Sequence, residues 1–275
     1  MEGWRPTGLD YLAAVTDLLQ RERVVGPASG VWEAADFQWW WRKDQHHDPR
    51  NQVFWDDASI VITHWGDYFG CELLGRRKGQ LLPLAMPRLR ELGLPTEMVI
   101  RDDDGELIQA ALDAGFEPSF EVGVTNVMPA EAVPPPINLP DDVRLLSRAE
   151  TTERPHHMIP RNGENVAERL SECSIYRPDH DLVLLGLDDE VAGYALFWPD
   201  PVTGVGLIEP VRIEKSFQGR GLGKAMMAEG VRRLAEAGCS SMRVTYLVGN
   251  QAAKRLYLGT GFQPLFSSTT FTLNH

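Results

Sequence analysis

A short glycine-rich segment, from Gln218 to Lys224, separates a strand-like run at residues 205–213 from a helix-like run at residues 225–237. Glycine has no Cβ, so backbone amides in this segment can come close to a bulky anion. The helix that follows directs its unpaired N–H groups and the positive end of its dipole toward the same point. The order of strand, glycine-rich loop and helix therefore predicts a phosphate-binding turn.

The spacing of this loop differs from two common nucleotide-binding motifs. No Ser or Thr follows Lys224, so the loop lacks the Mg²⁺ ligand of a nucleotide-hydrolysing P-loop. Its glycines are also spaced differently from those of the dinucleotide-binding fingerprint. The pattern Gln-x-x-Gly-x-Gly resembles the pyrophosphate signature of the GNAT-type, acetyl-CoA-dependent N-acetyltransferases. The resemblance implies that coenzyme A contacts Gln218, Gly219, Arg220, Gly221, Leu222, Gly223 and Lys224.

A second motif, the sequence NQAAKRLY beginning at Asn250, supports the same resemblance. Asn250 is a good N-cap for a helix over residues 251–260, and Gly261 is a good residue to end it. Tyr257 falls about two turns along this helix, on roughly the same face as Asn250. The resemblance implies that Asn250 and Ala253 lie beside the pantetheine arm, and that Tyr257 protonates the departing thiolate. A phenol with a pKa of about 10 is protonated at neutral pH and can serve as a general acid.

The dipeptide Glu209-Pro210 interrupts the strand that precedes the loop. Proline donates no ladder hydrogen bond, so a bulge is expected here, bending the strand away from its neighbour. The resemblance implies a splayed strand pair whose slot takes the pantetheine, with the segment Val211, Arg212 and Ile213 binding it through backbone amides. It also implies that Glu209 removes a proton from the amine, which a desolvated carboxylate with a raised pKa suits. The alternative is that Glu209 only orients a loop.

The composition of the 275-residue chain bounds the class of protein. It is 43% hydrophobic and 24% charged, as is usual for globular proteins, and no apolar run approaches the length of a membrane span. The formal net charge of −12 argues against nucleic acid and anionic membranes as partners. The start of the chain lacks the basic and apolar regions of a signal peptide. The three cysteines are scattered without metal-ligand or disulfide spacing, which indicates the cytoplasm.

Two other clusters are interpreted as structural. The pairs His46-His47 and His156-His157 lack the spacing of a helical metal pair, so we interpret them as surface or packing histidines and expect no metal. Three adjacent tryptophans, residues 39–41, cannot all face one way on a strand or helix, so at least one should meet another domain, a ligand or solvent. Packing in the core and between domains is the favoured interpretation, and an aromatic wall for a substrate is the alternative.

The chain divides at a segment with five prolines among residues 128–140, which predicts a semi-rigid linker. We expect one domain at residues 1–128, a linker at 129–140 and a second domain at 141–275. The two domains share a sequence pattern, because DGELIQAALDAGFEP from residue 104 matches NQAAKRLYLGTGFQP from residue 250. The repeat favours a tandem pair of related domains.

The predicted fold is α/β (α+β), with two acetyltransferase-like domains. Each has a mixed, mostly antiparallel central sheet flanked by helices, and the second has the splayed strand pair. The first copy is degenerate, because Ala111 replaces the tyrosine, Asp104 replaces the asparagine, and residues 75–79 replace the phosphate loop. It could help to shape the acceptor site or serve as a plain structural domain. Chance resemblance is a third possibility.

The resulting functional hypothesis is an acyl-CoA-dependent N-acetyltransferase that moves an acetyl group from acetyl-CoA to a primary amine of a small molecule by direct attack. The tandem arrangement is similar to that of the mycothiol synthases, although none of the motifs above is specific to their substrate. Two alternatives stay open at this point: a non-catalytic acyl-CoA-binding sensor, and a protein or peptide N-acetyltransferase.

Overall fold

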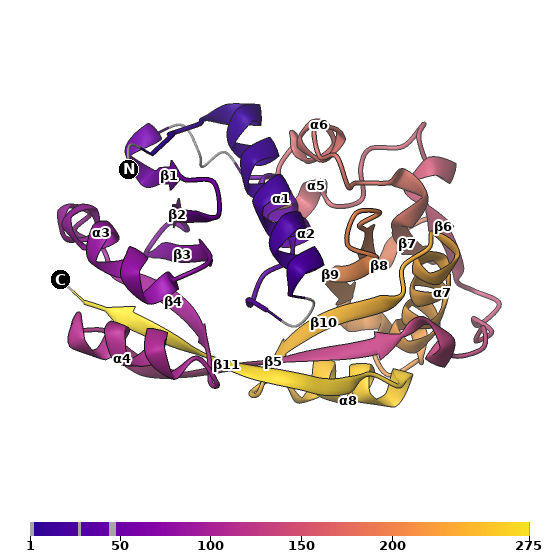
Figure 1. Ribbon diagram of the computed structural model, residues 1–275. Coiled ribbons are helices and arrows are strands. Elements are labelled where there is room, and N and C mark those ends of the chain that lie inside the picture. Colours follow the sequence, from indigo (N-terminus) through magenta and orange to yellow (C-terminus); the bar gives the residue numbers. More distant parts are fainter. Residues whose placement is uncertain (1–2, 27–28, 44–47, 275) are drawn as a thin grey trace.

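The computed structural model describes residues 3–26, 29–43 and 48–274, and Figure 1 shows the arrangement of its elements. His46 and His47 lie outside the described residues. The N-terminal half forms α1 (Gly8–Val25), α2 (Ala34–Trp40), β1 (Gln52–Phe54), β2 (Ala58–His64), β3 (Phe69–Gly75), α3 (Lys78–Glu91), β4 (Thr96–Arg101), α4 (Gly105–Asp113) and β5 (Glu117–Pro129). The C-terminal half forms β6 (Arg144–Ser147), α5 (Ile159–Asn162), α6 (Val166–Ser171), β7 (Asp181–Leu185), β8 (Val191–Pro199), β9 (Val205–Ile213), α7 (Leu222–Glu236), β10 (Ser241–Leu247), α8 (Gln251–Thr260) and β11 (Gln263–Leu273).

All of these strands join one sheet, in the order β1-β2-β3-β4-β11-β5-β10-β9-β8-β7-β6. Neighbours run antiparallel except for β3 with β4 and β9 with β10, which are parallel. Helices flank the sheet along its length (Figure 1). The predicted mixed, mostly antiparallel α/β class is confirmed.

The last strand of each half pairs with the other half. Strand β11 lies between β4 and β5, and β5 lies between β11 and β10. Figure 1 shows these two long strands side by side across the middle of the molecule. This exchange explains why the chain has one continuous sheet where the sequence predicted a sheet in each domain.

The sequence repeat corresponds to two helices that begin and end in the same way. The Asp104 side chain caps α4 by accepting a hydrogen bond of 3.1 Å from the amide of Leu107. The Asn250 side chain caps α8 with a bond of 3.0 Å from the amide of Ala253. Gly115 and Gly261 follow the two helices with φ values of 95° and 115°, a conformation that favours glycine.

The helices α1 and α2 bring tryptophans of the N-terminal half onto the C-terminal half. Trp39, Trp40 and Trp41 are all buried. Trp39 lies 6.5 Å from Trp198 of β8 between ring centroids, and the Trp41 indole donates a hydrogen bond of 2.6 Å to Glu172. The favoured interpretation of core and interdomain packing is therefore confirmed, and this packing holds α2 against β9.

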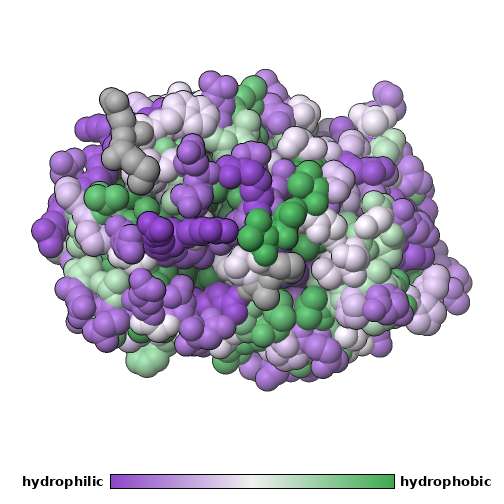
Figure 2. Space-filling model, in the orientation of Figure 1, coloured by the Kyte–Doolittle hydropathy of each residue, from purple (hydrophilic) through white to green (hydrophobic). Residues whose placement is uncertain are grey.

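None of the described helices combines the length and the apolar character needed to cross a bilayer. The face shown in Figure 2 is mostly hydrophilic, with hydrophobic side chains gathered over α1. Val24 and Val25, at the end of that helix, are exposed.

Candidate active site

Strands β9 and β10 pair over only part of their length. Their register ends at Leu207 opposite Arg243, and both strands continue beyond that point without pairing to each other. The register between β8 and β9 shifts at Glu209 and Pro210, where a bulge bends β9. The structure therefore has the splayed strand pair that the sequence predicted at this dipeptide.

The open side of β9 presents backbone amides. Beyond the end of β9, the Glu214 amide donates to the carbonyl of Ala192 on the β8 side, at 2.9 Å. Because amides alternate in direction along an extended strand, those of Val211 and Ile213 point away from β8, while that of Arg212 points toward it. The Gln218 side chain donates to the Ile213 carbonyl at 3.1 Å, on this same open side. Two amides thus face the slot, with Arg212 between them in the chain.

The glycine loop lies at the end of this slot. Gly219 and Gly221 both have φ values of 78°, and a Cβ at either position would find no described atom within 4 Å. Helix α7 begins at Leu222, so Leu222, Gly223 and Lys224 form its first turn, earlier than the predicted start at residue 225. The open space and the helix N-terminus together fit an anion such as a pyrophosphate.

The side chains of the loop differ in what they can offer such a group. Leu222 is buried, so only its backbone is available, whereas Lys224 is exposed. Arg220 forms an ion pair of 2.5 Å with Asp142. A positive contribution from Arg220 is therefore offset by its own carboxylate partner.

Helix α8 places Tyr257 beside the slot. The ring is buried and lies 6.4 Å from both Tyr246 and Phe262 between centroids. Burial and the nearby charge of Glu209 raise the pKa of the Tyr257 phenol well above its usual value. The phenol consequently holds its proton throughout the physiological pH range and is able to donate it.

A cavity of about 390 Å³ brings Glu209 and Tyr257 together. Its walls come from both halves of the chain, with Trp32, Glu33 and Asp36 around the start of α2 and with Arg243 on β10. Burial raises the pKa of Glu209, and this effect outweighs the opposing influence of a hydrogen bond from Asp36 and of the charge of Arg42.

The acidic residues of α2 were not found from the sequence. Glu33 and Asp36 form a capping box at the start of the helix, and no local signal links that pattern to a strand far along the chain. The Glu33 carboxylate also pairs with two guanidinium groups, those of Arg23 at 2.8 Å and Arg243 at 2.5 Å. These contacts tie α2 to β10 across the cavity.

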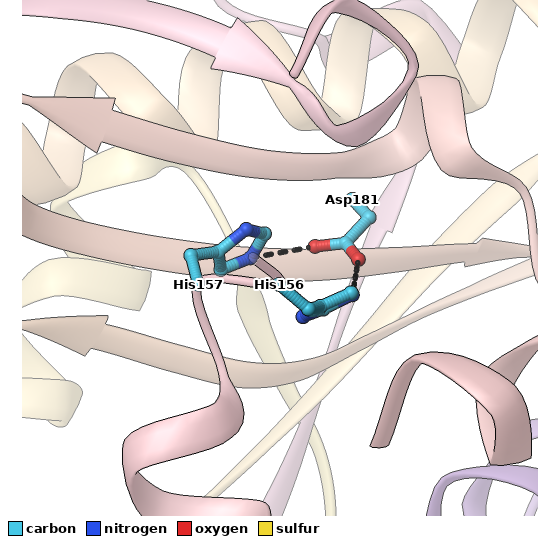
Figure 3. Close-up of side chains that lie close together, drawn as sticks. All are labelled: His156, His157 and Asp181. Carbon is cyan, nitrogen blue, oxygen red and sulfur yellow. Dashed lines mark ion pairs between the residues drawn. The ribbon is translucent and has the colours of Figure 1, made fainter. Parts of the chain in front are cut away.

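A second cluster surrounds Asp181, at the start of β7 (Figure 3). The Nε2 atoms of His156 and His157 lie 3.1 and 2.9 Å from its two oxygens, and the Tyr176 hydroxyl donates to it at 2.9 Å. Burial raises the pKa of Asp181, but the hydrogen bonds from both histidines outweigh it and hold that pKa at about 2. The Met158 amide donates to His156 Nδ1, so the ring proton is on Nε2.

The second cluster has the donor atoms of a possible metal site. One atom from each of His156, His157 and Asp181 lies within 4.8 Å of the others. The two histidine rings stack at 4.7 Å between centroids, and their side chains are buried. This burial agrees with the interpretation of His156 and His157 as packing residues, whereas the absence of a metal stays a prediction.

Comparison with known proteins agrees with this geometry. Residues 144–262 match the family model of the Acetyltransferase (GNAT) family. A mycothiol acetyltransferase from a Nocardioides species is 26% identical over 295 aligned positions, which cover 92% of this chain and 94% of that protein.

Two solved structures share the fold over nearly the whole chain. A tandem GNAT protein from the clavulanic acid biosynthesis pathway has a TM-score of 0.68 at 12% identity, with 98% of this chain and 97% of that chain covered. A GCN5-related N-acetyltransferase from Sphaerobacter thermophilus has a TM-score of 0.66 at 14% identity, with 99% and 95% covered. The chain has the tandem GNAT architecture, its C-terminal half belongs to the GNAT acetyltransferase family, and the protein is an N-acetyltransferase.

Proposed function

We propose that residues 141–275 transfer an acetyl group from acetyl-CoA directly to the primary amine of a small molecule, and that residues 1–128 help to enclose the acceptor. The observation that carries this proposal is the single cavity at the splayed strands that both Glu209 and Tyr257 line. A base for the amine and an acid for the leaving group must both reach the reacting atoms.

Acetyl-CoA supplies the thioester carbonyl that the amine attacks. The slot-facing amides of Val211 and Ile213, on either side of Arg212, hold the pantetheine as an added strand. Asn250 and Ala253 at the start of α8 lie on its other side. The pyrophosphate is held by backbone amides of the glycine loop and of the first turn of α7. The residues assigned to this contact are Gln218, Gly219, Arg220, Gly221, Leu222, Gly223 and Lys224.

Three proton transfers accompany the reaction. The Glu209 carboxylate accepts a proton from the ammonium group of the acceptor, because only the neutral amine has a lone pair for attack, and later releases it to solvent. The Tyr257 hydroxyl gives a proton to the sulfur that leaves, and the second proton that the attacking nitrogen loses on forming the amide restores the Tyr257 phenol. Burial favours both roles, since it raises the pKa of Glu209 and keeps the Tyr257 phenol protonated. The amide groups that line the slot stabilise negative charge on the carbonyl oxygen.

The size and walls of the cavity support a small acceptor. At about 390 Å³ it has the volume of a small-molecule site, and Trp32, Glu33 and Asp36, at or before the start of α2, form part of its wall. A peptide substrate would need an open groove.

The three cysteines are buried thiols without disulfide partners, which supports a reducing compartment such as the cytoplasm.

Calorimetric titration with acetyl-CoA, followed by a panel of amines assayed for release of free thiol, tests this proposal. One binding site and turnover of at least one small amine are expected. Two sites would mean that the N-terminal half also binds acetyl-CoA. Binding without turnover of any small amine or peptide would favour an acyl-CoA sensor, and failure to bind would overturn the proposal.

A further inference from the structure

The N-terminal half places a carboxyl group against the proposed base. Asp36 lies in the first turn of α2 and is only 6% exposed. Its Oδ2 accepts a hydrogen bond of 2.7 Å from the backbone amide of Glu33, which fixes the orientation of the side chain. Asp36 lines the same cavity as Glu209, and the two side chains share a hydrogen bond.

The neighbouring acids have different partners. Glu33 forms ion pairs with Arg23 and Arg243, and both pairs are buried. Asp36 instead meets a second acid, Glu209, and the positive charge that acts on this pair is that of Arg42, on the side of Glu209. A hydrogen bond between two carboxyl groups needs a proton, since two carboxylates are both acceptors.

The surroundings decide which of the two acids keeps that proton. Burial and the negative charges of Glu209 and Glu33 raise the pKa of Asp36 well above its usual value. Glu209 receives the hydrogen bond and feels the positive charge of Arg42, and both favour its ionised form. Tyr257 also feels the charge of Glu209 and stays neutral.

These influences favour Asp36 as the acid that holds the proton. Two carboxyl groups in contact in a buried site cannot both be ionised, because their negative charges repel each other. The pair therefore carries one negative charge at neutral pH.

We propose that Asp36 is a positioning residue for the base: its protonated carboxyl donates a hydrogen bond to Glu209, and this bond keeps Glu209 ionised and directed at the amine. The catalytic consequence of this hydrogen bond rests on the proposed function. The existence of the hydrogen bond does not depend on it. The N-terminal half of the chain then contributes a residue to the active site of the C-terminal half. The acceptor ammonium approaches a pair with a single negative charge and gives its proton to Glu209.

The pair can be observed without any acetyl transfer. The protein is labelled with ¹³C at the carboxyl carbons of Asp and Glu, and the two signals are assigned with Asp36→Asn and Glu209→Gln. In the unsubstituted protein, the Asp36 carbon should keep the chemical shift of a protonated carboxyl at pH 7. Titration of Asp36 near pH 4, independently of Glu209, would overturn the proposal.

Two substitutions separate this role from helix capping. Asp36→Asn keeps an oxygen for the Glu33 amide and an N–H donor for Glu209, whereas Asp36→Ala removes both. The midpoint of the Glu209 ¹³C titration should rise by about one pH unit in the Ala variant and stay near the unsubstituted value in the Asn variant. Thermal unfolding of both variants shows whether the Ala variant retains its fold. If it does not, the Asp36 signal in the unsubstituted protein decides.

With an active acceptor in hand, the pH profile of kcat/KM gives the catalytic readout. In Asp36→Ala the acidic limb of the profile should shift to higher pH by about one unit. At pH values on the acidic side of the limb, this shift corresponds to a roughly tenfold lower kcat/KM. Asp36→Asn should leave the limb in place. An equal loss at every pH, or the same profile shift in both variants, would overturn the positioning role. If no acceptor turns over, the proposed function fails while the ¹³C titration still tests the pair.

Discussion

The indole nitrogen of Trp198 donates a hydrogen bond of 2.8 Å to the backbone carbonyl of Glu209. Trp198 is fully buried on β8, and the carbonyl belongs to the bulge where β9 leaves its ladder. A carbonyl at a bulge lacks its regular strand partner, so the indole supplies the missing donor. The relationship fixes the backbone from which the proposed base projects.

Replacing Trp198 with Phe should lower kcat more than it weakens acetyl-CoA binding. The smaller ring leaves the Glu209 carbonyl without its donor, at a cost of about 1–3 kcal/mol in stability. We expect kcat to fall roughly tenfold, because a tenfold change corresponds to about 1.4 kcal/mol of transition-state positioning. Steady-state kinetics and thermal unfolding measure the two effects.

Trp40→Phe provides the matched control for that substitution. Trp40 is buried in the same hydrophobic cluster but packs on Trp32 and Trp65 of its own half. It should lose stability through packing while kcat stays close to that of the unsubstituted enzyme. Equal losses of kcat in both variants would show that general packing explains the effect.

Tyr257→Phe should reduce kcat by roughly 10²- to 10⁴-fold, the range typical of a lost general acid. The ring and its contacts with Tyr246 and Phe262 remain, so calorimetry should give nearly the same affinity for acetyl-CoA. Tyr246→Phe is the control, since it removes a neighbouring hydroxyl from the same cavity. A larger loss in the Tyr246 variant would move the acid role to that residue.

Glu72 should make the stability of the protein depend on pH. Burial raises the pKa of this β3 carboxyl to about 8, whereas an unfolded chain releases the proton near pH 4.3. The native state therefore binds more protons between these values, and stability falls as pH rises through that window, at most about 1.4 kcal/mol per pH unit.

Urea unfolding at pH 5, 7 and 9 measures this dependence. In Glu72→Gln the decline should be largely absent, and Glu121→Gln, at an exposed position of β5, should retain it. A pH dependence unchanged in the Glu72 variant would contradict the prediction.

Asp181→Asn should destabilise the protein by about 1–3 kcal/mol. The carboxylate accepts a hydrogen bond from the Tyr176 hydroxyl and lies 3.1 and 2.9 Å from Nε2 of His156 and His157, and an amide offers only one oxygen to these three groups. Asp188→Asn, at an exposed turn position, should leave the melting temperature unchanged. Differential scanning calorimetry compares the variants, and equal melting temperatures would show that the buried cluster contributes little.

The two halves should not fold separately. A chain cut between residues 132 and 133 leaves β5 without β10 and β11, and leaves β4 without β11. Unpaired strands in the middle of a sheet expose their backbone groups, so each fragment should give a poorly dispersed amide NMR spectrum. Mixing the fragments should restore the dispersion of the intact protein. A well-dispersed spectrum from residues 1–132 alone would show that the exchange is dispensable.

Sequence patterns predicted the parts of this protein that depend on near neighbours along the chain. The runs expected at residues 205–213 and 251–260 coincide with β9 and α8. The Asn250 cap, the positive φ of Gly261 and the bulge at Glu209-Pro210 each follow from the chemistry of one or two residues. These segments also contain many of the residues assigned to the proposed coenzyme A site.

Tertiary structure determined which strands and side chains contact those local elements. Several strands have similar propensities, so nothing local shows that β5 and β11 exchange partners; the packing of the whole sheet determines it. The contact of Asp36 with Glu209 likewise joins residues far apart in the chain, and the contact of Trp198 with Glu209 depends on the register of β8 against β9. An N-cap motif or a buried tryptophan has the same local pattern whatever it faces, and only the folded chain specifies the group on the other side.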